Sequence, residues 1–291
     1  MLFIGQKMSS QSMNPLAKHF RQPAIHLTLP SKGQYWPQGS LDLNMSGQLE
    51  IYPMTTKDEI TIRTPDALLN GTSIVSLFQS CCPQIKDAWK TPNIDVDAIL
   101  IGIRIATYGQ NMDLNTVCPN PECKNDNKHE LDLTVILDGL ACPNYNRTVE
   151  VNGLKVKLKP LTYFENNKSK MLTFEQDRAL SVIGDDNISD DKKIEAFNQH
   201  LANMVDINNG LITAGTEYIE TSDGTQVSDS MFIAEFYNNC DTKIVKAIKE
   251  RFEEFAKASE LPKPRISCEE CQTEYPVVVG FDYANFFVNA S

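Results

Sequence analysis

Two short cysteine loops, Cys118-Pro-Asn-Pro-Glu-Cys123 and Cys268-Glu-Glu-Cys271, decide the fold that we predict for this chain. Each loop is followed by an apolar-rich run, at residues 129–137 and 275–281. This spacing is typical of the two halves of a zinc ribbon. A tight turn presents two thiolates on one side, and zinc takes four ligands, so two facing loops would complete one tetrahedral shell. We therefore predict that Cys118, Cys123, Cys268 and Cys271 share one structural Zn²⁺.

The long separation of the two loops leaves two alternatives open. Residues 124–267 lie between them, a longer interval than a zinc ribbon usually has. Each loop could instead hold its own ion with other ligands, or the four thiols could be unrelated turn residues that bind no metal. His129 is the nearest alternative ligand, although we expect it to begin a strand. If the shared site forms, the metal joins the two ends of a long insertion.

The composition is that of a globular protein with an acidic surface. Of 291 residues, 41% are hydrophobic and 22% are charged, and the formal net charge is −11. Nucleic-acid affinity depends on Lys and Arg side chains that neutralise phosphates, so this charge argues against a nucleic-acid partner. It favours solubility and protein partners that carry basic patches.

The sequence shows no recognisable targeting or membrane segment. The first residues lack the basic and apolar regions of a signal peptide, and the longest apolar run, 98–106, is too short to span a bilayer. We therefore expect a cytosolic protein, in which thiols stay reduced and zinc is favoured over disulfides. The other cysteines lack ligand spacing and are expected to act as small buried hydrophobes: Cys81, Cys82, Cys142 and Cys240.

The N-terminal part predicts an arm followed by a small α+β module. Residues 1–26 show no sustained period, so we expect an extended arm that is disordered or is ordered by a partner. Alternating apolar residues predict strands over 25–29 and 48–53. A Thr-x-x-Glu capping box within 55–59 and a Thr-Pro pair at 64–65 predict helix starts. Apolar residues at helical spacing predict helices over 74–82 and 96–106, although the alternation of isoleucines at 101, 103 and 105 leaves a strand as the alternative for the second.

Three side chains of this module have two possible roles. Tyr35 and Trp36 are expected to pack within the chain, with the anchoring of a partner as the alternative. Arg104 lies off the apolar stripe of its helix. We expect it to be solvated or ion-paired, with the binding of an acidic group as the alternative.

The middle of the chain predicts a hairpin followed by helices. Two alternating runs around Asn152-Gly153 are a strong hairpin signal, and the lysines on its outward face, at 155, 157 and 159, are expected to be solvated. From residue 162 the pattern is mostly helical, with a polar break at 184–187 and a second hairpin over 217–227. The last helix is expected to begin after Asp241 and to end before residues 261–264, where two prolines stand.

The predicted fold class is α+β, and one of the predicted modules is made of two segments that are distant in sequence. After the arm come an N-terminal strand-and-helix module over 27–110 and a zinc-ribbon-like module made of two distant segments, 111–141 with 260–291. Residues 142–259 form the inserted β-hairpin and helical domain. The aromatic tail, with Phe286 and Phe287, is expected to pack on the metal module.

A catalytic set of residues is not apparent in the sequence. It has no Gly-rich phosphate loop, His-Glu-x-x-His motif or nucleophile elbow, and its four histidines are scattered. A shell of four thiolates leaves no open position for water on the metal. We therefore expect no enzymatic activity, no catalytic residues and no small-molecule substrate.

Several short blocks that occur in one order resemble the baseplate hub and hub-assembly proteins of contractile-tailed bacteriophages of the T-even type. The resemblance covers residues 27–140 and 265–290, whereas 142–260 match only by position. The blocks are Leu29-Pro-Ser-Lys-Gly-Gln-Tyr35, Glu50-Ile-Tyr-Pro-Met-Thr-Thr-Lys-Asp-Glu59, Thr64-Pro-Asp-Ala-Leu-Leu-Asn-Gly71, Arg104-Ile-Ala-Thr-Tyr-Gly109 with the cysteine loop that follows it, and Cys268-Glu-Glu-Cys271 with Phe286-Phe287.

This resemblance implies a structural component or assembly factor of the central baseplate hub, without enzymatic activity. Its partners would be other phage tail and baseplate proteins, with no nucleic acid and no membrane. Its location would be the tail baseplate of the virion, and the host cytoplasm during assembly. The resemblance implies nothing about metal. The cysteine loops taken alone support a different class, a cytosolic zinc-ribbon regulatory or nucleic-acid-associated protein, which would need a basic face and salt-dependent binding.

Overall fold

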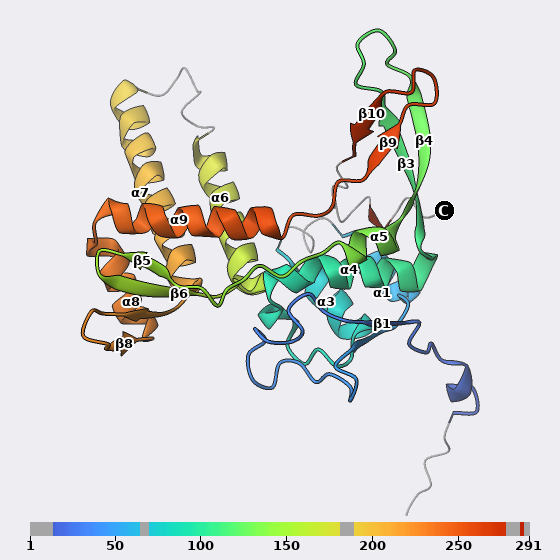
Figure 1. Cartoon of the computed structure of the whole chain (residues 1–291), viewed down its shortest axis with the longest axis horizontal. Coiled ribbons are helices and arrows are strands. Elements are labelled where there is room, and N and C mark those ends of the chain that lie inside the picture. Colours follow the sequence, from blue (N-terminus) through green and yellow to red (C-terminus); the bar gives the residue numbers. More distant parts are fainter. Residues whose placement is uncertain (1–13, 65–69, 181–188, 278–285, 288–291) are drawn as a thin grey trace, which may run out of the picture.

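The computed structural model describes residues 14–64, 70–180, 189–277 and 286–287. Helices and small antiparallel sheets form two lobes, and a pair of hairpins projects from one of them (Figure 1). The predicted α+β class is therefore confirmed. Within these residues, no helix is both long and apolar enough to cross a membrane. The predicted domain boundaries stay a prediction.

The first lobe packs short strands and helices around the long helix α4. Its elements are β1 (Ile25–Leu27), β2 (Leu49–Ile51), α1 (Thr56–Ile62), α3 (Thr72–Cys81), the 3-10 turn η2 (Ala88–Lys90), α4 (Asn93–Tyr108) and α5 (Leu133–Asp138). Strands β1 and β2 pair antiparallel, with Ile25 opposite Ile51. Gly102 of α4 lies directly against this pair, because a Cβ atom there would be 2.4 Å from Cδ1 of Ile51. A larger residue at 102 would require the side chain of Ile51 to shift.

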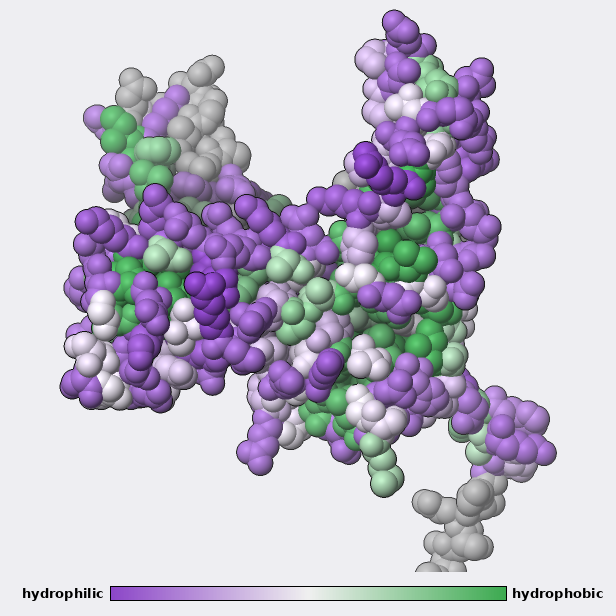
Figure 2. Space-filling view, in the orientation of Figure 1, coloured by the Kyte–Doolittle hydropathy of each residue, from purple (hydrophilic) through white to green (hydrophobic). Residues whose placement is uncertain are grey.

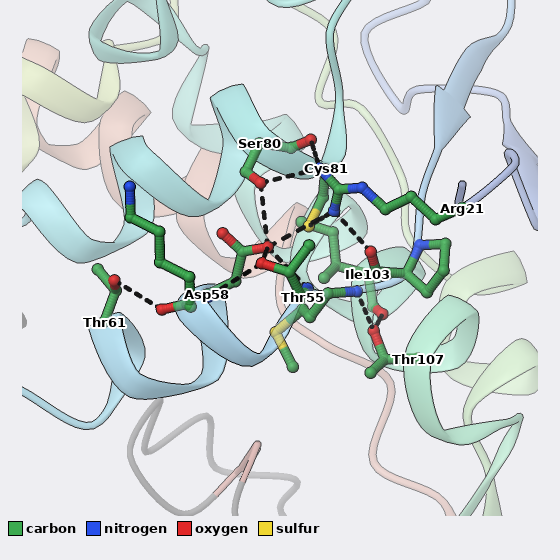
Figure 3. A network of polar contacts seen from close by, with 11 residues as sticks. Arg21, Thr55, Asp58, Thr61, Ser80, Cys81, Ile103 and Thr107 are labelled. Carbon is green, nitrogen blue, oxygen red and sulfur yellow. Dashed lines mark hydrogen bonds and ion pairs between the residues drawn. The ribbon is translucent and has the colours of Figure 1, made fainter. Parts of the chain in front are cut away.

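The chain before β1 is fastened to this lobe by Arg21. Its guanidinium donates hydrogen bonds to the carbonyl oxygens of Pro53 and Ser80, each over 2.7 Å, and reaches Asp58 at 3.5 Å (Figure 3). The arm also contains a short 3-10 turn, η1 (Ala17–His19), which is mostly exposed. Residues 1–13 of the predicted arm lie outside the described residues. The part that begins at Arg21 is attached to the first lobe by these contacts.

Helix α1 begins one residue earlier than the sequence pattern predicts. Thr55 is the N-cap, and the reciprocal partner is Asp58 rather than Glu59. The backbone amide and hydroxyl of Thr55 both donate to Asp58, over 2.8 and 2.7 Å (Figure 3). Asp58 is the better partner here because the hydroxyl of Ser80 and Arg21 also reach its carboxylate. The predicted helix start at 64–65 lies at the edge of the undescribed residues 65–69.

Tyr35 and Trp36 pack within the chain, as expected. The ring of Tyr35 lies 5.3 Å from that of Tyr145, and Trp36 packs against the core of the first lobe. The indole nitrogen of Trp36 donates to the carboxylate of Asp95 over 2.8 Å. Asp95 is fully buried and also accepts hydrogen bonds from the amide and the hydroxyl of Ser31. Burial raises the pKa of this carboxyl, and these hydrogen bonds oppose the shift.

The predicted exposure of Arg104 is wrong. Its side chain is only 1% exposed, and its guanidinium lies over the rings of Tyr108 and Phe286, 5.5 and 5.4 Å from their centres. No carboxylate of the described residues lies within ion-pair distance of it. Burial lowers the pKa of Arg104. Helix α4 is covered on more than one side, so the face opposite its apolar stripe is also buried.

Phe286 and Phe287 lie away from the cysteine cluster, in a core that also contains Leu133 and Ile136 of the predicted metal module. They are 5% and 1% exposed and belong to the hydrophobic core of the first lobe. Their predicted companions in the tail, 281–285, lie outside the described residues. The C-terminal aromatic pair therefore packs in the same core as the N-terminal strands.

The second lobe combines a four-stranded antiparallel sheet with four helices. Its strands, in sheet order, are β5 (Val149–Val151), β6 (Leu154–Leu158), β7 (Thr216–Glu220) and β8 (Gln226–Val227), and its helices are α6 (Tyr163–Leu180), α7 (Asp190–Ala214), α8 (Ser230–Asn239) and α9 (Thr242–Ala258). Both predicted hairpins and the last helix are confirmed. Asn152 and Gly153 have positive φ, as the tight turn between β5 and β6 requires, and Asp241 caps α9.

The core of the second lobe is separate from that of the first. It forms between the sheet and helices α7, α8 and α9, around Val156, Ile212 and Ile248. Of the three lysines expected to be solvated on the outer face of the hairpin, Lys155 and Lys159 are exposed and Lys157 is half-buried. Lys155 pairs with Glu220 across the sheet at 3.0 Å. The predicted break at 184–187, between α6 and α7, lies outside the described residues.

Candidate metal centre

Two β-hairpins bring the cysteine loops together. One hairpin consists of β3 (Asn111–Val117) and β4 (Asp126–Asp132), and the other of β9 (Arg265–Ser267) and β10 (Glu274–Pro276). Each cysteine loop is the turn of its hairpin. The two hairpins stand side by side on the first lobe, away from the second lobe (Figure 1). The strand predicted after the first loop ends early, because Asp132 caps α5 and turns the chain into a helix at Leu133.

The two turns have the same local geometry. In each, the first cysteine donates its backbone amide to the residue two positions after the second cysteine: Cys118 to Asn125 over 2.9 Å, and Cys268 to Thr273 over 3.0 Å. The residue directly after the second cysteine is left-handed in both, with φ of 49° at Lys124 and 59° at Gln272. Such backbone is strained for residues other than glycine. Because this left-handed conformation occurs at both equivalent positions, we infer that each turn orients its two sulfurs towards the same side.

The four predicted ligands meet in one cluster. Their Sγ atoms all lie within 4.8 Å of one another, with 3.6 Å between Cys118 and Cys271 and 3.7 Å between Cys123 and Cys268. Four thiolates at about 2.3 Å from a central zinc would be separated by about 3.8 Å along each edge of the tetrahedron. A disulfide would need about 2.05 Å between sulfurs, and all four cysteines are free. The cluster therefore has the donor set and the spacing of a tetrahedral metal site.

The surroundings of the four thiols differ from one side of the cluster to the other. Cys118 and Cys268 are buried against Leu114, Tyr275 and Val277, whereas Cys271 is exposed. Burial raises the pKa of the Cys118 thiol to about 12. The side chain of Thr273 lowers the pKa of Cys271 to about 6. The buried pair thus lies at the hairpin interface, and Cys271 is the sulfur that faces solvent.

A polar network joins the hairpins independently of the sulfurs. Asn127 of β4 is 1% exposed, and its side-chain oxygen accepts the backbone amide of Glu269 over 3.0 Å. Its nitrogen donates to the hydroxyl of Tyr275 over 3.3 Å, and that hydroxyl lies 2.7 Å from the hydroxyl of Thr116. The sequence does not single out these three residues, because a polar residue in a short strand has no pattern that reveals a distant partner.

The other candidates from the sequence lie away from the cluster. His129 lies within β4, opposite Leu114, and no metal-ligating group of three or more among the described residues includes it. Cys81 and Cys82 are buried in the core of the first lobe, and Cys142 and Cys240 are half-buried. Burial raises the pKa of Cys81 to about 12, which keeps this thiol protonated and inert. Cys81 and Cys82 are therefore the small buried hydrophobes that we expected, whereas Cys142 and Cys240 are only partly buried.

The chain matches the family described as "T4 bacteriophage base plate protein" over residues 22–288. The match includes both lobes and both cysteine hairpins. Searches of curated proteins and of solved structures give no match.

Proposed function

The chain belongs to the family of T4 bacteriophage base plate proteins, and from this premise we propose that it is a non-enzymatic component or assembly factor of the central baseplate hub. It acts there through contacts with other tail proteins. The observation that carries the proposal is the extent of the family match, which runs from residue 22 to residue 288 and so concerns the whole architecture. The position in the hub rests on the ordered sequence blocks that resemble hub and hub-assembly proteins.

The surface chemistry supports protein contacts as the mode of action. A net charge of −11 disfavours binding to phosphate backbones and favours proteins with basic patches. The most deeply buried charged groups are engaged in packing: Asp95 accepts three hydrogen bonds and Arg104 is enclosed by aromatic rings. This use of charged groups fits a structural protein better than a catalyst.

The metal in this proposal is one structural Zn²⁺ held by Cys118, Cys123, Cys268 and Cys271. The sulfur separations of 3.6 and 3.7 Å fit a shell of four thiolates. Such an ion supplies no reaction. It joins one hairpin from the middle of the chain to another near its C-terminal end, and so fixes the surface that they present to a partner.

A conditional-lethal phage tests the function. The gene for this chain, in the phage that encodes it, is interrupted by an amber codon, and the phage is grown in suppressing and non-suppressing hosts. Without suppression we expect tails to be lost or baseplates to lack their central part in electron micrographs. Infectious particles with intact tails from the non-suppressing host would contradict the proposal.

Mass spectrometry of purified virions separates the two roles within the proposal. A component remains in the mature particle, whereas an assembly factor is required but absent from it and is found in the host cytoplasm. A gel-retardation assay with the purified chain tests the alternative function. Nucleic-acid binding at physiological salt, with a steep salt dependence, would favour the zinc-ribbon regulatory alternative.

A further inference from the structure

Helix α7 carries an apolar stripe that its own lobe leaves uncovered. Ile194, Phe197, Leu201 and Val205 are 59%, 50%, 47% and 56% exposed. At 100° per residue these four positions fall within a sector about 80° wide. Figure 2 shows hydrophobic residues on the outer side of this helix, above the body of the second lobe. A narrow apolar stripe on a solvated helix is the pattern of a surface that packs against another helix.

The stripe lies on the same face of α7 as the residues that pack in the core of the second lobe. Ile212, seven residues after Val205, lies on the same side of the helix and is 3% exposed in the core of the second lobe. Near that end, α8 lies beside α7, and Asn209 donates to Asn238 over 2.9 Å. The N-terminal half of the helix extends beyond this cover (Figure 1). The exposed half is therefore a packing face of the same kind whose partner is missing.

Helix α6 does not supply that partner. It contacts α7 on another side, where Asn203 donates to Gln176 over 2.9 Å and Ile207 faces a cavity shared with Leu172. Positions 203 and 207 lie more than about 100° around the helix from the centre of the stripe. The two helices thus form a pair that leaves the stripe open on its outer face.

We propose that this stripe packs against the same stripe of a second copy of the chain, with the two α7 helices antiparallel about a two-fold axis. The spacing is self-complementary. An axis near residue 199 places Ile194 opposite Val205 of the second copy, and Phe197 opposite Leu201. A two-fold interface requires this reciprocity, in which each residue and its partner exchange roles between the copies. Two helix pairs meeting in this way form a four-helix arrangement.

The flanks of the stripe permit such pairing in a chain whose net charge is −11. Asn198, Ala202 and Asp191 border the stripe on one side, and Met204 and Lys193 border it on the other. The two charged residues both lie near the N-terminal end of the helix. About an axis near residue 199, an antiparallel pair places Asp191 near Asn209 of the second copy and Lys193 near Met204 of the second copy. Like charges are therefore not brought together, whereas a parallel pair would place each charge beside its own copy.

The size of the stripe sets the strength of the pairing. It is about 17 Å long, and its apolar area is on the order of a few hundred Å², the size at which an exposed patch marks an interaction site. A stable interface buries about 800 Å² on each partner. We therefore expect a dimer that depends on concentration and that forms readily only where copies are brought close, as in an assembling particle.

Sedimentation velocity of the full chain over a concentration series tests the pairing. Wild type should shift from monomer to dimer as concentration rises. Phe197→Glu with Leu201→Glu should raise the dissociation constant by at least about tenfold, with an unchanged circular dichroism spectrum because both side chains are half-exposed. Phe232→Glu on α8 is the matched control, since Phe232 is 61% exposed and lies outside the stripe. It should dimerise like wild type.

A charge pair then tests the antiparallel direction. In the variant Phe197→Lys with Leu201→Glu, an antiparallel dimer places each lysine opposite a glutamate of the second copy, so dimerisation should return. A parallel dimer places like charges opposite each other and stays weak. A wild-type chain that remains monomeric at every concentration overturns the proposal, even if it binds another tail protein through the stripe. Failure of the charge pair to restore a dimer that the two glutamates abolish overturns the antiparallel arrangement. Neither result bears on the family assignment or on the hub role.

Discussion

Loss of the metal from the four-cysteine site should loosen both hairpins, including the one that keeps its cysteines. Cys268→Ser is the sharpest perturbation, because Cys268 is fully buried and lies 3.7 Å from Cys123 in the other loop. Cys118 and Cys271 are 153 residues apart. A link that closed such a loop in a flexible chain would stabilise the fold by about 5 kcal/mol through loop entropy.

The structure lowers this figure, because the ends of the insertion are already in contact. A Cβ atom at Gly139 would lie 2.4 Å from Cγ of Pro262, so the chain that leaves the first lobe touches the chain that returns to it. From that contact to the cysteines, the metal closes a loop of roughly 30 residues, which corresponds to about 4 kcal/mol. Links of this kind usually stabilise a fold by about 2–4 kcal/mol, and we expect Cys268→Ser to lower the stability of the hairpins by an amount in that range.

Hydrogen exchange at single amides measures this loss where it should occur. The amides of Cys118 and Cys268 each donate within their own turn. Because about 1.4 kcal/mol is a factor of ten, both should exchange at least about 30-fold faster in Cys268→Ser and in chelator-treated wild type. Amides of α9 should be unchanged, since its core is separate. Cys240→Ser, at a half-buried cysteine outside the cluster, is the control.

Metal analysis should give about one zinc per wild-type chain. Either of two results would refute the reasoning. A metal-free wild-type preparation with both turns fully protected would show that the polar network around Asn127 holds the hairpins alone. Fast exchange at Cys268 with unchanged exchange at Cys118 would show that the two loops do not share an ion.

Two further predictions concern the first lobe. Arg21→Ala should lower the free energy of unfolding by about 2 kcal/mol, because charged hydrogen bonds to two carbonyl oxygens are lost, and should extend proteolytic cleavage towards β1. In urea denaturation, Arg21→Lys should recover only part of this loss. Equal stability of the wild type and both variants would contradict the role of the two guanidinium nitrogens. Gly71→Ala should destabilise the protein much more than Gly47→Ala. Both glycines have φ above +70°, but only at Gly71 would the new Cβ meet Asn167, at 2.8 Å. Equal decreases in melting temperature for the two variants would show that backbone strain, and not this contact, determines the loss of stability.

The local signals in the sequence were enough to predict many of the elements. Asn152-Gly153 specifies its hairpin because two consecutive residues with positive φ fit few other structures. Asp241 specifies the start of α9 because its side chain accepts the amide of Lys243, a bond made within three residues. Patterns of this kind contain both partners of the interaction, so no knowledge of the rest of the fold is needed.

The cysteine cluster could be predicted for a related reason. Each loop contains two ligands of one type in a tight turn, and four thiolates complete a shell without any other residue. The network around Asn127, Tyr275 and Thr116 has no such signature. Its members are 148 and 159 residues apart in sequence, and each belongs to a residue type that is common in strands and turns. Only the fold shows that they meet.

The burial of Arg104 and the contact of Phe286 with it could not be predicted from the sequence, for a single physical reason. An arginine off an apolar stripe is normally solvated, and an aromatic pair after a metal loop would normally pack on that loop. Here the C-terminal chain crosses to the first lobe, and Phe286 covers the guanidinium of Arg104 at 5.4 Å. Each of the two side chains supplies the environment that makes the other's position favourable. Neither position can be derived without the other.

The two ends of residues 140–261 lie close together on the first lobe. The chain leaves the first lobe at Gly139 and returns at Pro262, and these two residues are in contact. Leu140 and Leu261, next to them, both pack against the core of the first lobe. The C-terminal segment then passes through the cysteine hairpins before Phe287 enters that core. The cysteine cluster therefore lies between two points that are already fixed on the first lobe, so an ion bound there should position the hairpins and not hold the two lobes together.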